Sequence, residues 1–218
     1  MNVRNQVLVS GGVIGVMFAV AGWAASRVPD QIAVHWNMEG RPDGHMERTA
    51  ALVVVPAVAV ILTGFFAVAP AVMPAASKLE RSAAAWKADW IVVLIGLLLC
   101  QLLIVVANLG VQLDVPRCAS IIAALMMLVV GNWLGKVRYN YIFGVRTPWT
   151  LANERVWDRT HRFAGRVMVL AALTLGAVCL LLPTFPQAGL VVTAAAILCA
   201  SLPALAAVIY SAMITIPS

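Results

Sequence analysis

The sequence predicts an all-α integral membrane protein, a helical bundle with six transmembrane helices and a cytoplasmic amphipathic helix between the fourth and fifth spans. Hydrophobic residues make up 62% of the 218 residues and charged residues 11%, whereas soluble domains usually carry about 25% charge. The mean hydropathy is +0.94. The apolar residues also gather in long runs with almost no charge. A water-soluble fold of this size could not cover so much apolar surface, so the surrounding medium is lipid.

Six apolar runs are long enough, or nearly so, to cross roughly 30 Å of hydrocarbon at about 1.5 Å per residue. They cover residues 5–26, 50–73, 90–109, 118–135, 164–182 and 190–214. Pro56 and Pro70 predict a kink in the second run. Pro183, Pro186 and Gly189 divide the uncharged carboxyl-terminal stretch into two helices. The first run also resembles a cleavable signal sequence, but its length favours a span that is retained.

The distribution of Lys and Arg predicts the side that each loop faces. Six spans place both termini on one side of the membrane. With that side inside the cell, eleven of the fifteen basic residues lie in inner segments and four in outer segments. The inner residues are Arg4, Lys78, Arg81, Lys87 and seven residues between 136 and 166, and the outer residues are Arg27, Arg41, Arg48 and Arg117. We therefore expect cytoplasmic amino and carboxyl termini.

Two regions follow from this order of spans. Residues 1–76 hold two spans and an outer polar loop, residues 27–49, and residues 77–218 hold four spans and an inner basic loop, residues 136–166. In the outer loop we expect solvated turns at Glu39–Gly40 and Asp43–Gly44. Its candidate ligand-binding residues are Asp30, His35, Trp36, Asn37 and Asp43.

A divalent cation is an alternative ligand for the outer loop, because carboxylates and imidazoles could coordinate it. The two His residues, His35 and His45, are ten positions apart, which matches no known ligand spacing. We therefore expect no metal and no cofactor. Cys100, Cys118, Cys179 and Cys199 form no CxxC or Cys/His spacing and are interpreted as structural thiols.

In the inner loop, Thr147 followed by Pro148 predicts a helix start. If that helix continues to Arg166, four arginines fall within an arc of about 60°: Arg155, Arg159, Arg162 and Arg166. Such a stripe fits lipid phosphates, an acidic cytoplasmic partner or an anionic ligand. Direct nucleic-acid binding is not expected, because no nucleic-acid module accompanies the charge.

Glu154, Asp158 and His161 share another face of this predicted helix. They could form an acid/base or metal trio, although a salt bridge between Asp158 and Arg162 is the simpler interpretation. The candidate signature and partner-binding residues of the inner loop are Asn132, Lys136, Arg138, Asn140, Arg146, Thr147, Trp149, Thr150, Glu154, Arg155, Trp157, Asp158, Arg159, His161 and Arg162.

Two stretches resemble known families. The outer loop resembles the DUF1648 module of bacterial membrane proteins through Pro29, Asp30, His35, Trp36, Asn37, Gly40, Pro42 and Asp43. It departs from that pattern at Ala33, where a proline is common. The inner loop is similar to the SdpI family signature at Gly131, Asn132, Gly135, Lys136, Arg138, Asn140, Gly144, Arg146, Thr147, Trp149, Thr150, Leu151, Trp157, Thr160 and His161.

This resemblance implies a six-helix protein of the bacterial cell membrane that protects the producing cell from a secreted, membrane-active peptide toxin. It also implies a signalling role in which a cytoplasmic repressor is held at the membrane. The expected partners are therefore membrane lipid, a peptide toxin and a repressor, and we expect no catalytic residue. A small-solute or ion transporter is the alternative, and the predicted span interiors oppose it because they contain only uncharged polar groups such as Gln101 and Asn108. A membrane-embedded enzyme is a further alternative without a matching motif.

Overall fold

The computed structural model describes residues 2–72, 79–183 and 187–215. Lys78 and Pro186, which entered the predictions above, lie outside these ranges. Six long helices form the body: α1 (Arg4–Ala24), α2 (Arg48–Val72), α4 (Ala83–Asn108), α5 (Val115–Leu134), α7 (Glu154–Leu181) and α8 (Ala188–Met213). Between α1 and α2 lie β1 (Gln31–Trp36) and β2 (Pro42–Glu47), and the short α6 (Pro148–Ala152) precedes α7.

All six long helices have the length and hydropathy of membrane spans, so the predicted all-α membrane bundle is confirmed. At most 33% of the most apolar window of any span is buried against protein. Large apolar side chains such as Leu8, Ile61 and Leu180 are instead exposed on the outside of the bundle. Such a surface is stable only against hydrocarbon, and the chain is therefore a multi-pass membrane protein.

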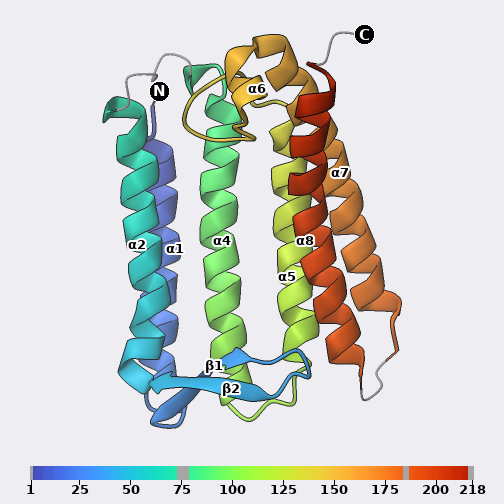
Figure 1. Cartoon of the computed structure of the whole chain (residues 1–218). Coiled ribbons are helices and arrows are strands. Elements are labelled where there is room, and N and C mark those ends of the chain that lie inside the picture. Colours follow the sequence, from blue (N-terminus) through green and yellow to red (C-terminus); the bar gives the residue numbers. More distant parts are fainter. Residues whose placement is uncertain (1, 73–78, 184–186, 216–218) are drawn as a thin grey trace.

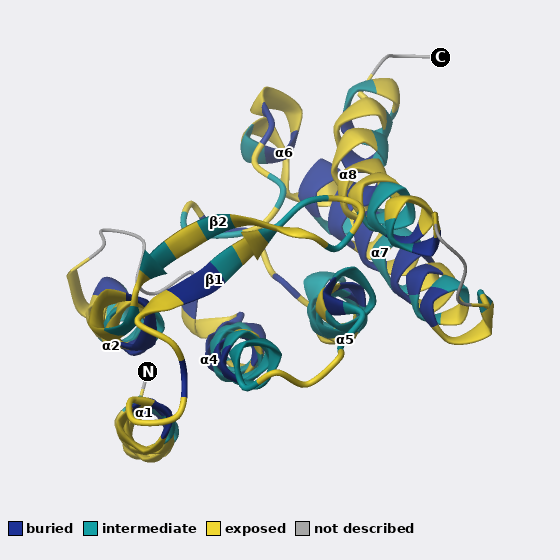
Figure 2. Ribbon diagram, turned by 90° about the horizontal axis from the view of Figure 1, so that it is seen from below, coloured by how far each residue is buried: buried dark blue, intermediate teal, exposed yellow. Residues whose placement is uncertain are grey.

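The two polar regions lie at opposite ends of the bundle (Figure 1). One end carries α6, the start of α1 and the end of α8, and the other end carries the β1–β2 hairpin. Viewed along the bundle, the hairpin runs across the helix ends from α2 toward α8 (Figure 2).

The predicted outer loop is a β-hairpin, which was not expected. β1 and β2 pair antiparallel, with Gln31 opposite Glu47 and register irregularities around His35. The predicted turn at Asp43–Gly44 is wrong, since both residues lie in β2. The predicted turn at Glu39–Gly40 is confirmed: the chain reverses between Asn37 and Arg41, where the Asn37 side chain accepts hydrogen bonds from the backbone N–H groups of Glu39 and Arg41.

The third span begins earlier than predicted. α4 starts at Ala83 rather than near Trp90, which places Lys87 and Asp89 inside the helix. Asp89, which the prediction left outside the third span, therefore lies within the first two turns of this helix. Within the described residues, the buried Oδ1 atom of Asp89 has no hydrogen-bond partner.

The predicted separate amphipathic helix is also wrong in its extent. The Thr147 cap and the Pro148 start are confirmed, but the helix ends at Ala152. Asn153 then starts α7, because its side chain accepts hydrogen bonds from the backbone N–H groups of Arg155 and Val156. The arginine stripe therefore belongs to the fifth span, whose 28 residues measure about 42 Å and extend past the hydrocarbon.

α5 and α7 pack closely through glycines. A side chain at Gly165 would place its Cβ 2.7 Å from the carbonyl oxygen of Gly131, so the two backbones touch at this level. At the same end, Trp86 of α4 donates a hydrogen bond to the Phe66 carbonyl of α2 and meets the ring of Phe143 of the inner loop edge-on. These contacts join the first helices to the inner loop.

Candidate functional site

A cavity of about 750 Å³ lies between the hairpin and the hairpin-side ends of α4, α5 and α8. This volume is within the range of about 300–1,000 Å³ that is typical of small-molecule sites. We call it the outer cavity. It is lined by Val34, His35, Trp36, Asn37, Met38, Asp43, Cys100, Leu103, Ile104, Val115, Pro116, Ala119, Ser120, Ala123, Thr193 and Ala196.

Four of the five predicted outer-loop residues line this cavity: His35, Trp36, Asn37 and Asp43. The His35 Nδ1 atom lies 2.5 Å from the Asp43 Oδ1 atom, and both side chains are solvent-accessible. Asp30 does not line the cavity. Its carboxylate instead pairs with Arg48 at 3.0 Å and so joins the start of the hairpin to α2.

The walls of the outer cavity combine aliphatic side chains with a few polar groups. Leu103, Ile104 and Val115 supply apolar surface, while Ser120 and Thr193 supply hydroxyl groups. His35 and Asp43 provide a polar pair on the hairpin side. An amphipathic ligand is the chemical class that such a lining fits.

The hairpin is held over the cavity by a side-chain clamp from α4. Asn108 Nδ2 donates to the Ala33 carbonyl, and Asn108 Oδ1 accepts from the Ala33 N–H, each at 2.9 Å. The amide therefore pairs with β1 as a neighbouring strand would. At the other end, the hairpin tip lies on α8: a Cβ at Gly189 would be 2.9 Å from the Met38 carbonyl oxygen.

Sequence reasoning noted Asn108 only as an uncharged polar group, and it missed Gly189 as a contact for the tip. An isolated Asn at the end of an apolar run is a usable signal, because it needs a polar partner there. Metal coordination receives no support: in the described part of the chain, no three His, Cys, Asp or Glu residues are placed to hold an ion.

At the opposite end, several predicted inner-loop residues are buried and build the loop itself. Asn140 donates to the Arg138 carbonyl and accepts from the backbone N–H groups of Ile142 and Phe143. Ser82, the N-cap residue of α4, which the sequence analysis did not single out, accepts from the Arg138 N–H at 2.8 Å. These bonds fix the path of the loop against α4.

Thr147 and Thr150 form a capping box at the start of α6. Thr150 Oγ1 also donates to the Val145 carbonyl. Thr147 Oγ1 lies 3.1 Å from Ser211 Oγ of α8. Because these hydroxyl groups are engaged with each other, with the backbone or with Ser211, we assign them a structural role rather than ligand binding.

The imidazole of His161 is fully buried, and its hydrogen bonds indicate that it is neutral. Its Nε2 atom accepts the Val145 N–H at 2.9 Å, so this nitrogen carries no proton. Its Nδ1 atom then donates to the Trp157 carbonyl. The ring stacks on Trp157 with centroids 4.0 Å apart, and Trp157 Nε1 donates to the Val137 carbonyl. Both ring nitrogens are occupied, which argues against the acid/base trio with Glu154 and Asp158.

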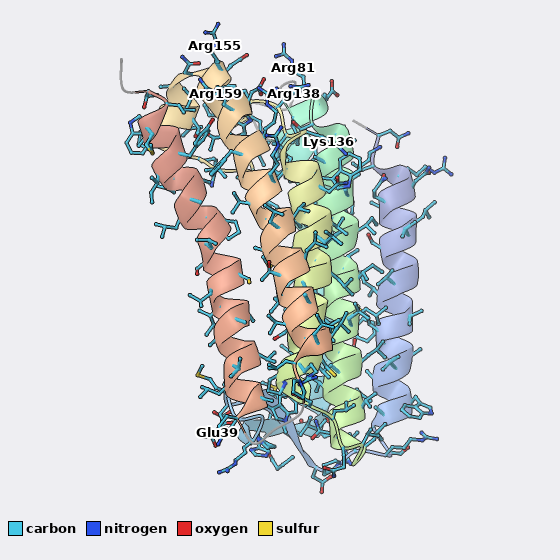
Figure 3. All side chains as sticks on the ribbon, turned by 90° about the vertical axis from the view of Figure 1, so that its right-hand side faces the viewer. Glu39, Arg81, Lys136, Arg138, Arg155 and Arg159 are labelled. Atoms are coloured by element: carbon cyan, nitrogen blue, oxygen red, sulfur yellow. The ribbon has the colours of Figure 1, made fainter. Side chains whose placement is uncertain are left out.

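The remaining residues predicted in the inner loop lie on the surface of the protein. Asp158 is 3.5 Å from Arg138 Nη1, rather than bound to Arg162 as expected. Arg155 and Arg159 point away from the bundle at this end (Figure 3). The other exposed residues of the predicted set are Asn132, Lys136, Arg146, Trp149, Glu154 and Arg162. The inner loop thus has a buried polar frame and a cationic surface.

The hydroxyl group of Tyr139 lies next to this frame and is hydrogen-bonded to Tyr141. The Tyr139 hydroxyl donates to the Leu151 carbonyl at 2.7 Å. The neighbouring Tyr141 hydroxyl and burial raise the pKa of Tyr139 to about 12. Tyr139 therefore stays protonated and structural at physiological pH.

Comparisons with known proteins agree with both resemblances. The family model described as the SdpI/YfhL protein family matches residues 136–215, and the DUF1648 domain of unknown function matches residues 12–60. The immunity protein SdpI of Bacillus subtilis (strain 168) is 24% identical over 143 residues, which is 66% of each chain. No solved structure gives a significant match. The chain is therefore a multi-pass membrane protein whose carboxyl-terminal part is similar to the SdpI/YfhL family and whose amino-terminal part is similar to the DUF1648 domain.

Proposed function

We propose that this chain is a non-catalytic immunity protein that binds a secreted, membrane-active peptide toxin in the outer cavity. The observation that carries the proposal is the cavity itself, which both matched regions help to form: DUF1648 supplies the hairpin and the SdpI/YfhL region supplies α8. Its amphipathic lining suits a peptide that partitions into membranes. The relative named immunity protein SdpI supports the same class of function.

The proposed orientation puts the hairpin outside the cell and α6 in the cytoplasm, in a bacterial cell membrane. The excess of Lys and Arg on the α6 side supports it. The test is a single cysteine at Ala152 or at Glu39, in a chain whose native cysteines are replaced. An impermeant thiol reagent added to intact cells should label the Glu39 variant only. Labelling at Ala152 before lysis would contradict the orientation.

Toxin binding is tested by filling the outer cavity. Ala119 of α5 lines the cavity and is exposed, so Ala119→Trp occupies the space without disturbing a packed contact. The matched control is Ala200→Trp on α8, at an exposed position that does not line this cavity. At equal membrane amounts, cells with Ala119→Trp should lose protection in a toxin challenge, and cells with Ala200→Trp should keep it. Equal protection by both variants would remove the cavity from the mechanism.

The proposed signalling role uses the exposed cations of the inner loop. Arg138, Arg146, Arg155 and Arg159 are exposed there and suit an acidic surface on a cytoplasmic repressor. Arg155→Glu with Arg159→Glu should abolish capture of the repressor from the chain's own operon while leaving protection unchanged. Full capture by this variant would assign the cations to another role.

A further inference from the structure

A second concave site lies at the α6 end, between α5 and α7. A groove of about 550 Å³ follows the line where the two helices meet. Its floor is formed by the glycines that bring the helices together, since Gly131, Gly135 and Gly165 have no side chains to fill it. We call it the cationic groove. It is lined by Gly131, Asn132, Gly135, Lys136, Arg162, Gly165, Arg166, Val169 and Leu170.

All the charged residues that line the groove are cations. Lys136, Arg162 and Arg166 are all exposed, and none of the lining residues is acidic. The acid predicted to neutralise Arg162 is engaged elsewhere, because Asp158 pairs with Arg138. Within the described residues, no carboxylate forms an ion pair with any of these three cations. The groove therefore favours an anion.

The polarity of the groove changes along its length. On α7, Arg162 and Arg166 are followed at helical spacing by Val169 and Leu170, so the lining turns from cationic to apolar over about 12 Å. Leu170 is 64% exposed, which opens the apolar end toward the surrounding membrane. Lys136 Nζ lies 4.2 Å from the Trp133 ring centroid, and tryptophan marks the headgroup level of a bilayer.

We propose that the cationic groove binds one anionic phospholipid from the leaflet on the α6 side. Arg162, Arg166 and Lys136 hold its phosphate, Asn132 hydrogen-bonds its polar linker, and an acyl chain lies along Val169 and Leu170. A soluble acidic segment of a partner protein fits less well, because the apolar end faces the hydrocarbon. The proposal does not depend on the immunity function.

The test is native mass spectrometry of the full chain, delipidated in mild detergent and then mixed with phosphatidylglycerol or with phosphatidylcholine of the same acyl chains. The wild-type chain should retain one phosphatidylglycerol in preference to phosphatidylcholine. Arg162→Gln with Arg166→Gln should reduce that preference roughly tenfold or more, since each cation near an anionic headgroup contributes to binding. Asn132→Trp keeps every charge but occupies the groove, and it should also lose the lipid.

Arg155→Gln with Arg159→Gln is the matched control, because it removes the same charge at the same spacing on α7 from residues outside the groove. This control should retain the lipid. The proposal is overturned if the control loses the preference as fully as the groove variant, or if Asn132→Trp binds normally. It is also overturned if the wild-type chain shows no preference, or if millimolar inorganic phosphate displaces the lipid completely.

Discussion

The two polar ends of this bundle use their polar residues in opposite ways. At the hairpin end, His35 and Asp43 are accessible beside the outer cavity. The hairpin itself is held by Asn108 of α4 and by its contact with Gly189 of α8. At the α6 end, Asn140, Thr150 and His161 are fully buried and bind the backbone of their own loop. Polar residues therefore form an accessible surface beside a cavity at one end and a buried support for the loop at the other.

The largest effect should come from the most confined glycine of the inner loop. Gly144 has φ +114°, and a Cβ there would collide with the His161 ring. We expect Gly144→Ala to lower the free energy of unfolding by about 3 kcal/mol, through backbone strain and displacement of the imidazole. Thermal unfolding in detergent measures the change. Gly176→Ala, with no atom near its added Cβ, is the control, and equal stability of the two variants would show that the loop is not rigid.

A smaller loss is expected at the hairpin end. Asn108→Ala removes both hydrogen bonds to Ala33, a residue that is 8% exposed, and leaves its backbone groups unpaired at about 1–3 kcal/mol. Hydrogen exchange of the Ala33 amide should accelerate, and toxin protection should fall with it. Asn132→Ala changes the same residue type at an exposed position and should do neither. A hairpin that stays protected in Asn108→Ala would contradict the clamp.

Trp157 and Trp149 of the inner loop allow a buried supporting residue to be compared with a surface residue of the same type. Trp157 is fully buried and donates to the Val137 carbonyl, so Trp157→Phe keeps the ring but leaves that carbonyl unpaired. We expect a loss of about 1 kcal/mol in detergent unfolding. Trp149 is 38% exposed, and Trp149→Phe should leave stability within error. The opposite order would reverse the roles assigned to these residues.

The smallest effect concerns pH at the junction of the hairpin and α2. The backbone N–H groups of Thr49 and Ala50 hold the pKa of the Glu47 carboxyl below its ordinary value of 4.5. The ionised form therefore stabilises this junction above that value, and the contribution is lost as the pH falls through the lowered pKa. Glu47 is fully exposed, so the change is slight. The protection factor of the Ala50 amide, which is its exchange rate relative to the intrinsic rate at the same pH, should fall at low pH in the wild type, whereas Glu47→Gln should show no such fall.

Hydropathy was sufficient to predict the six spans, because a bilayer permits few alternatives to apolar helices. Their ends were predicted less well. α4 continues through Lys87 and Asp89 to Ala83, since charged residues are tolerated where a helix passes into the headgroup region. The chain breaks between α6 and α7 at Asn153. Asparagine can also occur inside a helix, so the position of this break follows only from the hydrogen bonds by which Asn153 caps α7.

The hairpin could not be predicted from local preference. β1 contains Ile32, Val34 and Trp36, which favour strands, but β2 begins with Pro42, Asp43 and Gly44, which do not. β2 pairs with β1, and β1 is bound on its other side by Asn108, a residue far along the chain. For the same reason, four of the five residues that the sequence singled out in this loop line the outer cavity, while the residues of α4, α5 and α8 that complete it could not be foreseen.

The contact between the hairpin tip and α8 has a consequence for engineering and for evolution. One face of the outer cavity is formed by the amino-terminal hairpin and the opposite face by the carboxyl-terminal helix α8. Transplanting residues 27–49 from a related protein would thus alter which ligand is accepted while leaving the membrane scaffold intact. Recognition in such two-part proteins can diversify by recombination, without waiting for changes in the helices.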